Sequence, residues 1–113
     1  MVEVSIGNSN QTKEKLFPDS SDKSESVNRG YMVFKKNCIS CHSLNLEGGA
    51  VGPELNVPKN ILEYEDSNFL KEFIANPNSF RARSKMPSFG SILSPQELND
   101  VLEYLAWMGK HKI

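Results

Sequence analysis

The 113-residue sequence is poor in cysteine and histidine, with two of each, and it has no long apolar run and no excess of one charge. Its 13 Lys and Arg against 14 Asp and Glu give a net charge of −1, which excludes the general basic character of nucleic-acid-binding domains. No apolar run approaches the ~20 residues that a membrane-spanning helix needs. Residues 1–5 lack the basic region followed by an apolar stretch that marks a signal peptide.

The first 28 residues differ in composition from the rest of the chain. They are rich in Ser, Asn, Asp and Lys, so we expect residues 1–28 to form a polar N-terminal extension or linker that contributes little to a core. Residues 29–113 then form one folded domain. A domain of about 85 residues often needs a metal or a cofactor for stability.

The spacing of apolar residues predicts an all-α fold with three main helices, over residues 27–38, 67–76 and 95–109. The last helix has the clearest start, because Ser94-Pro95-Gln96-Glu97 combines an N-cap serine, a proline at the first position and a glutamate three residues after the cap. The candidate N-caps of the other two helices are Ser24 or Ser26, and Asp66 or Ser67. The long loops 43–60 and 77–93 call for another organiser, such as a buried prosthetic group.

Both cysteines lie in the segment Cys38-Ile39-Ser40-Cys41-His42, which has the pattern of c-type haem attachment. In this chemistry the two thiols add to the two vinyl groups on one edge of the porphyrin, and the adjacent histidine reaches the iron from one side. The motif therefore predicts one covalent haem c, with Cys38 and Cys41 as its thioethers and His42 as an axial ligand of the iron.

Two other interpretations of the cysteine pair stay open at this point. A Cys-x-x-Cys redox site normally lies in a βαβ setting, and the sequence shows no such strands. A structural zinc site needs four ligands, which only Cys38, Cys41, His42 and the remote His111 supply together. His111 lies in the last three residues, and we expect it to be frayed.

The iron also needs a sixth ligand or an open position, and Met86 is the best candidate. It lies in a loop far beyond His42, in Lys85-Met86-Pro87, so the chain can travel round the macrocycle. Met32 is too close to Cys38 on the same helix, Met108 lies beside the core stripe of the last helix, and His111 is less suitable than either. The alternative role of Met86 is a core residue that fills a gap.

From Arg29 onward the sequence resembles a class I cytochrome c domain of the bacterial type. The residues that carry the resemblance are Gly30, Phe34, Cys38, Cys41, His42, Gly52, Pro53, Met86, Pro87, Val101, Tyr104 and Leu105. The resemblance implies the cytochrome c fold, in which three main helices and long loops wrap around one covalent haem.

The resemblance also implies roles for single residues. Gly30 and Phe34 would meet the last helix at a group of its residues, Val101, Tyr104 and Leu105. The carbonyl of Pro53 would accept a hydrogen bond from the free ring nitrogen of His42, which orients the ring and raises its basicity as a ligand. Candidate partners of the haem propionates are Asn56, Tyr64, Arg81 and Arg83.

The implied function is a single-electron carrier, not an enzyme, that shuttles electrons between a donor and an acceptor protein. With His42 and Met86 on the iron, no position is vacant for a substrate. The alternative is a haem c subunit or domain of a larger respiratory redox enzyme, such as a nitric-oxide reductase, a sulphur-compound dehydrogenase or an oxidase. A haem catalyst or a small-gas sensor would require Met86 to leave the iron.

The resemblance further implies a periplasmic protein, because haem is attached to this motif outside the bacterial cytoplasm. We then expect the signal or anchor segment to be missing from this chain. Three basic residues precede the proposed ligand, Arg81, Arg83 and Lys85. They are suited to docking an acidic partner or to steering a haem propionate, and a merely solvated cluster is the third interpretation.

Overall fold

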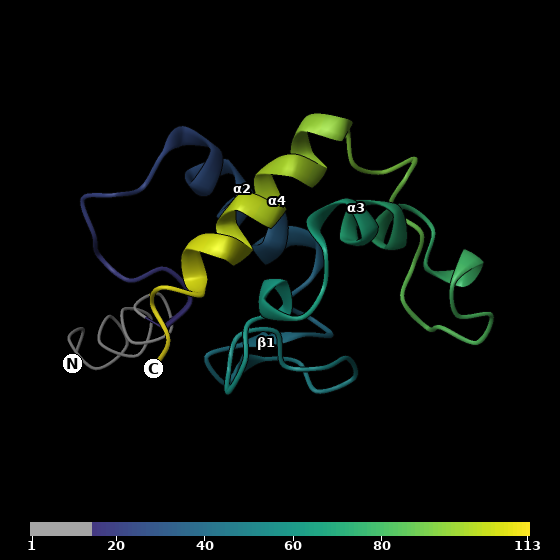
Figure 1. Cartoon of the computed structure of the whole chain (residues 1–113), viewed down its shortest axis with the longest axis horizontal. Helices are drawn as coiled ribbons and strands as arrows, with labels where there is room; N and C mark the ends of the chain where they lie inside the picture. Colours follow the sequence, from purple (N-terminus) through teal and green to yellow (C-terminus); the bar gives the residue numbers. More distant parts are fainter. Residues whose placement is uncertain (1–14) are drawn as a thin grey trace, which may run out of the picture.

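The computed structural model describes residues 15–113 as three main helices joined by long loops, so the predicted all-α fold is confirmed (Figure 1). The elements in chain order are α2 (Glu25–Asn37), β1 (Ser43–Leu44), β2 (Glu47–Gly48), the 3-10 turns η1 (Ile61–Glu63) and η2 (Pro77–Ser79) on either side of α3 (Ser67–Ala75), and α4 (Pro95–Met108). Residues 1–14 of the expected N-terminal extension lie outside the described residues. No helix within residues 15–113 is long and apolar enough to cross a membrane.

The helices begin where side chains satisfy their first backbone N–H groups. Ser24, one of two candidates, accepts from the backbone of the first turn of α2, and Asp66 does the same for α3. Ser94 and Glu97 cap α4 reciprocally, and Pro95 occupies its first position, as the sequence predicts. One unpredicted feature is a minimal antiparallel hairpin, in which Leu44 pairs with Glu47.

The core is built around the crossing of α2 and α4, which lie against each other in the centre of the molecule (Figure 1). A Cβ atom at Gly30 would overlap the carbonyl oxygen of Asp100 and lie 2.6 Å from Cβ of Tyr104. The Phe34 ring lies 5.7 Å from the Tyr104 ring. Only glycine allows this approach of the two backbones, so the predicted contact of Gly30 and Phe34 with Tyr104 is present.

The crossing also contains a buried carboxylate, Asp100, which is 2% exposed. It accepts hydrogen bonds from Ser26 Oγ at 2.7 Å and from Arg29 Nε at 2.8 Å. The Arg29 guanidinium holds the pKa of Asp100 below its ordinary value, and the hydroxyl of Ser26 acts in the same direction. The two helices are thus joined by charge as well as by close packing.

Residues 15–24, which we call the N-terminal strap, pack against both helices. Leu16 and Phe17 are buried in the core, and the Phe17 ring stacks on Tyr31 at 4.2 Å. The hydroxyl of Tyr104 donates to the carbonyl oxygen of Leu16. The expectation that residues 1–28 contribute little to the core is therefore wrong for this part, because two large apolar residues in a polar segment reach the helix pair. A domain boundary between residues 28 and 29 stays a prediction.

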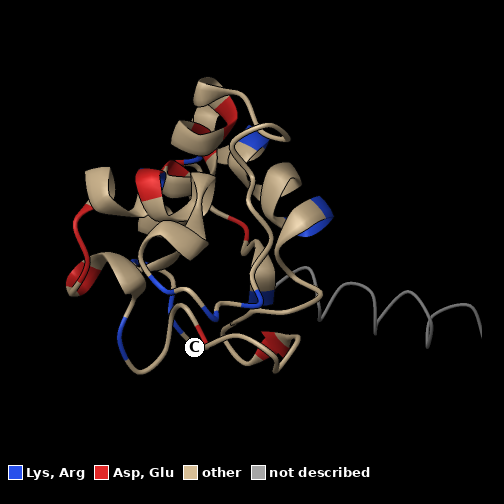
Figure 2. Ribbon diagram, turned by 90° about the vertical axis from the view of Figure 1, so that its right-hand side faces the viewer, with Lys and Arg blue, Asp and Glu red and all other residues tan. Residues whose placement is uncertain are grey.

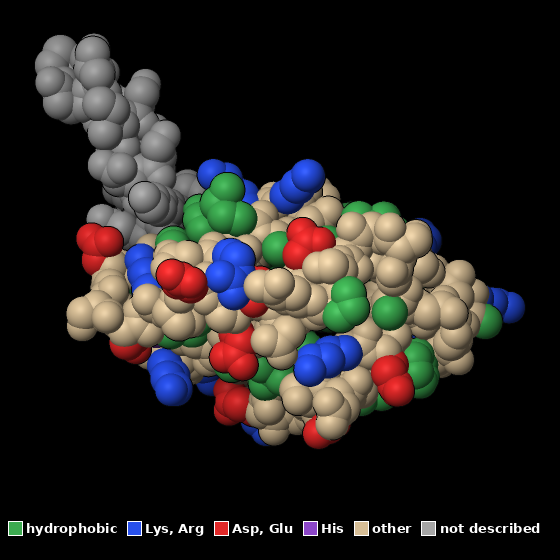
Figure 3. Space-filling model, turned by 90° about the horizontal axis from the view of Figure 1, so that it is seen from above, with side chains coloured by type: hydrophobic (Ala, Val, Ile, Leu, Met, Phe, Trp, Pro, Cys, Tyr) green, Lys and Arg blue, Asp and Glu red, His purple; other side chains and the backbone are tan. Residues whose placement is uncertain are grey.

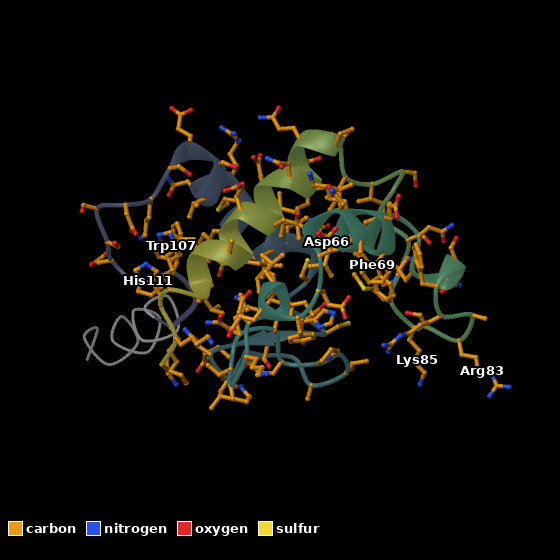
Figure 4. The ribbon with its side chains drawn as sticks, viewed as in Figure 1. Asp66, Phe69, Arg83, Lys85, Trp107 and His111 are labelled. Atoms are coloured by element: carbon orange, nitrogen blue, oxygen red, sulfur yellow. The ribbon has the colours of Figure 1, made fainter. Side chains whose placement is uncertain are left out.

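The end of α4 is held by the same strap. The Trp107 indole donates to Asp22 at 2.9 Å, and the ring of His111 stacks on that indole at 3.9 Å (Figure 4). His111 Nε2 lies 3.7 Å from the Asp22 carboxylate. The expected fraying of His111 is therefore wrong, because an aromatic partner and an acidic neighbour hold its ring.

Candidate haem site

The attachment motif follows directly on α2. Cys38 is the C-cap of this helix and donates its backbone N–H to Phe34 at 2.8 Å. The backbone N–H groups of Cys41 and His42 both turn back to the carbonyl of Cys38, at 3.2 and 2.9 Å. This tight turn presents two free, partly buried thiols and an imidazole from five consecutive residues.

The environment of Cys38 does not suit a thiol-redox site. Burial, with a smaller contribution from Cys41, raises the pKa of the Cys38 thiol to about 12. A reactive redox cysteine needs the opposite shift, because the thiolate is the nucleophile. The structure thus favours two thiols that are consumed by covalent attachment over a pair that cycles through a disulfide.

A zinc site at these residues is contradicted by the geometry. Within residues 15–113, no three side chains of the types His, Cys, Asp and Glu are placed to hold one metal ion. His111 lies at the end of α4 against Trp107, so it does not converge with Cys38, Cys41 and His42. The four ligands that structural zinc requires are therefore not assembled.

The imidazole of His42 is held by the segment Gly52-Pro53, as the resemblance implies. Its Nδ1 lies 2.9 Å from the carbonyl oxygen of Pro53. A Cβ atom at Gly52 would lie 2.6 Å from Nδ1, so only glycine leaves room for the ring. The carbonyl can accept only from a protonated Nδ1, which leaves Nε2 as the nitrogen with a free lone pair for a metal. The donor set and this cradle fit a haem c.

Met86 lies in the loop between η2 and α4, partly buried against the core. Its backbone N–H donates to Ser84 Oγ at 3.2 Å. Met32 is 60% exposed on the outer side of α2, and Met108 is fully buried within α4. Among the methionines of the described residues, Met86 alone combines a loop position with partial burial, as a ligand that completes a site would require.

The candidate partners of the haem propionates differ in burial and in hydrogen bonding. Asn56 is wrong for this role, because its amide nitrogen already donates to the Asn45 side chain and to the carbonyl of Met108, and its oxygen accepts from Asn60. Tyr64, Arg81 and Arg83 are exposed and remain predictions.

The sequence did not single out the polar residues that hold the loop 43–60. Glu54, Asn45 and Asn60 take part in buried or partly buried hydrogen bonds with backbone groups from several segments. Asn60 carries one local signal, a capping box with Glu63 at the start of η1. No such signal marks Asn45, whose partners come together only in the folded protein. A cluster of aromatic rings near the Met86 loop, formed by Phe69, Phe73 and Phe80, was also not predicted.

Comparison with known proteins assigns the family. The family model described as cytochrome c matches residues 27–109. The chain is 36% identical over 107 residues to a nitric oxide reductase subunit of Stutzerimonas stutzeri, covering 86% of this chain and 70% of that protein. It is 35% identical over 98 residues to the corresponding nitric oxide reductase subunit of Paracoccus denitrificans, covering 80% of this chain and 64% of that protein.

A second kind of relative is a cytochrome c6 of Petalonia fascia. It is 31% identical over 81 residues, which cover 70% of this chain and 88% of that protein. The family match spans most of the chain and includes the haem-attachment motif, Pro53 and Met86. The chain therefore belongs to the cytochrome c family, whose members carry electrons on a covalently bound haem c.

Proposed function

We propose that this electron carrier attaches its haem through Cys38 and Cys41 and uses His42 and Met86 as the axial ligands of the iron. The observation that carries this proposal is the cradle of His42, whose Nδ1 lies 2.9 Å from the Pro53 carbonyl. A histidine that donates one ring proton to a carbonyl is the usual arrangement of a metal-ligating histidine.

The residues of the site favour electron transfer over catalysis. The bound haem c supplies an iron that alternates between the ferric and ferrous states by one electron. Pro53 orients His42 and raises the basicity of its imidazole, and the thioether of Met86 would be the second side chain that holds the iron. A thioether opposite histidine favours the ferrous state and raises the reduction potential. With His42 and Met86 both holding the iron, the haem would have no open position for a substrate.

The ligand assignment is tested by the variant Met86→Ala. It should open the sixth position, abolish the sulphur-to-iron absorption band of the ferric protein, lower the reduction potential and allow carbon monoxide to bind. Met32→Ala is the matched control, because the Met32 side chain is 60% exposed on α2. An unchanged spectrum of Met86→Ala would refute the assignment.

We infer that the redox partner presents an acidic surface to the loop that carries Met86. Arg81, Arg83 and Lys85 are exposed, and none of them takes part in the ion pairs of the described residues. Figure 4 shows Arg83 and Lys85 directed away from the body of the molecule. Elsewhere the charges are mixed, as the distribution in Figure 2 and the face in Figure 3 illustrate. A local basic group beside the site is suited to transient docking, which needs only a small interface.

We propose a periplasmic location and a place in a respiratory chain, as a free or tethered carrier. The support is the chemistry of the attachment motif, since haem is joined to Cys38 and Cys41 outside the bacterial cytoplasm in this family.

A second candidate function is a haem c subunit of a larger respiratory enzyme. The two relatives that are subunits of nitric oxide reductase favour it, because each is at least 35% identical and covers at least 80% of this chain. Purification from native membranes under mild conditions separates the two functions. A subunit should elute with a larger catalytic partner in fixed proportion, whereas a carrier should elute alone and exchange electrons with an oxidase or reductase in solution.

A further inference from the structure

The side chain of Glu54 is bound by backbone groups on both sides of the loop that carries Pro53. Its Oε1 accepts from the N–H of Leu46 at 2.8 Å, and its Oε2 accepts from the N–H groups of Asn56 at 2.6 Å and Val57 at 2.7 Å. Three charge-assisted hydrogen bonds to one carboxylate are among the stronger interactions available to a loop. Both carboxylate oxygens are needed to join the two segments, since the N–H donors of each segment approach a different oxygen.

The first of these segments is the turn between β1 and β2. Asn45 and Leu46 both have positive φ angles, of 52° and 68°. Leucine is unfavourable in this region, and Leu46 is also 68% exposed, so little burial offsets the strain. The hydrogen bond from Leu46 to the Glu54 carboxylate helps to hold this turn in its conformation.

The second segment is Asn56-Val57, which follows Pro53 after Glu54 and Leu55. Between them and Pro53, Leu55 donates its N–H to the carbonyl of Ser43 at 2.9 Å, next to His42. The backbone that follows the Pro53 carbonyl is therefore held by the hydrogen bonds of Glu54 and Leu55. This arrangement leaves the Pro53 carbonyl little freedom to move away from His42.

Glu54 remains ionised in this setting. Burial opposes ionisation, but the hydrogen bonds from Leu46, Val57 and Asn56 outweigh it and hold the pKa of the carboxyl below its ordinary value. The Glu54 carboxylate is therefore charged at neutral pH.

We propose that Glu54 is a positioning residue for His42: it holds the Pro53 carbonyl against Nδ1 and so sets how strongly the imidazole binds iron. This inference rests on the proposed function, in which His42 is an axial ligand. The role is indirect, because Glu54 contacts the loop backbone and the Ser43 side chain rather than the imidazole itself.

The test uses the full haem-loaded chain and the variant Glu54→Gln. Glutamine replaces one acceptor oxygen by a donor, so at least one backbone N–H loses its partner. The Nδ1 proton of His42 should then exchange with solvent about tenfold faster, because a hydrogen bond to a charged group is worth at least the free energy of one decade. The reduction potential should rise, since a weaker bond to Pro53 lowers the basicity of the ligand.

Glu47→Gln is the matched control. It removes the same charge from the same loop, 43–60, but the side chain of Glu47 pairs with Lys15 and not with the loop backbone. A Glu54→Gln protein whose ring proton exchanges as slowly as in Glu47→Gln would overturn the inference. A wrong ligand assignment would be seen separately in the wild-type ferric protein. The NMR signals of the His42 ring would then lack the large shifts that ferric iron induces in a ligand.

The wild-type protein supplies a second test if Glu54→Gln does not fold. The amide protons of Leu46, Asn56 and Val57 should exchange with the same opening free energy and denaturant dependence as the His42 ring proton. The reason is that a single opening event, the loss of the hydrogen bonds to Glu54, would expose all of them. A ring proton that exchanges while these three amides stay protected would contradict the inference.

Discussion

The two loops that carry Pro53 and Met86 are held in different ways. The loop 43–60 is fixed by side chains that reach α4, the N-terminal strap and the end of the chain. The loop 77–93 forms backbone hydrogen bonds mainly with itself, from Arg81 to Pro77 and from Ser84 to Arg81, and bonds to the backbone of α3 only near its end, at Phe89 and Gly90. Another contact with α3 is the packing of the Phe80 ring against Phe69 and Phe73. Figure 1 shows this second loop at the end of the molecule opposite to the C-terminus.

A chain of three buried asparagines accounts for the first loop. Asn45 donates to the carbonyls of Lys15 and His111, Asn56 donates to Asn45 and to the carbonyl of Met108, and Asn60 donates to Asn56 and to the carbonyl of Leu105. The two carbonyls of α4 in this chain, those of Leu105 and Met108, also accept from the backbone N–H groups of Gly109 and His111. The asparagines add a second bond to each and thereby attach the loop to α4.

The difference indicates how the site is assembled. The polypeptide itself orients His42 through Gly52 and Pro53, so the half of the site on that side is formed by protein contacts. The position of Met86 depends on fewer contacts with the rest of the protein. In the proposed function the bond from its sulphur to iron supplies the missing constraint, which makes the Met86 side the easier one to open.

The largest effect that distinguishes the two loops should come from Gly52→Ala. The added Cβ would lie 2.6 Å from Nδ1 of His42, so the ring must move and lose the bond to Pro53. We expect a loss of more than about 3 kcal/mol in the free energy of unfolding and a perturbed haem spectrum. Denaturant unfolding followed by haem absorbance measures both.

The matched variant in the other loop is Gly90→Ala. Its Cβ would lie 3.1 Å from the carbonyl oxygen of Ala75, which requires only a small adjustment. A cost of about 1 kcal/mol or less is expected. Equal costs for Gly52→Ala and Gly90→Ala would contradict the conclusion that the two loops are held in different ways.

The second effect concerns the asparagine chain. Asn56→Ala removes one buried hydrogen bond each from the carbonyl of Met108 and from the side chains of Asn45 and Asn60, which should cost about 2 to 3 kcal/mol in total. Asn78→Ala, at an exposed position of η2, should change the free energy of unfolding by about 0.5 kcal/mol or less. Similar losses in the two variants would show that the buried network does not hold the first loop.

The third effect tests the helix crossing that supports both loops. The pKa of Asp100 lies below its ordinary value of 3.8, chiefly because of Arg29, so the pair stabilises the fold above that pH and the contribution is lost as the pH falls further. Asp100→Asn should lower stability at neutral pH and flatten its decline below about pH 4. Thermal unfolding across this range, with the exposed Glu103→Gln as control, measures the slope. An Asp100→Asn curve parallel to that of the wild type would contradict the role of this pair.

Much of this molecule was predictable because its signals are local. The N-caps of all three helices, the haem-attachment motif and the glycine at the helix crossing depend on neighbours in sequence or on a family pattern. The N-terminal strap was missed because Leu16 and Phe17 are two apolar residues in a polar segment, and only the assembled helix pair offers them a surface. The asparagine chain and the bond from Leu46 to Glu54 were missed because they join segments that are distant in sequence, which no side-chain pattern reveals.

The smallest effect concerns the charges of the Met86 loop, which has fewer contacts with the rest of the protein. Arg83 and Lys85 are exposed and directed outward (Figure 4). Replacing both with Gln should slow oxidation of the reduced protein by anionic hexacyanoferrate about two- to threefold at low salt, because local positive potential concentrates anions. The difference should disappear at high salt, where charges are screened over a few ångströms. The control replaces Lys35 and Lys36 on α2 with Gln. If both double variants slow the reaction equally, net charge alone controls the rate and the Met86 loop is not the side at which electrons leave.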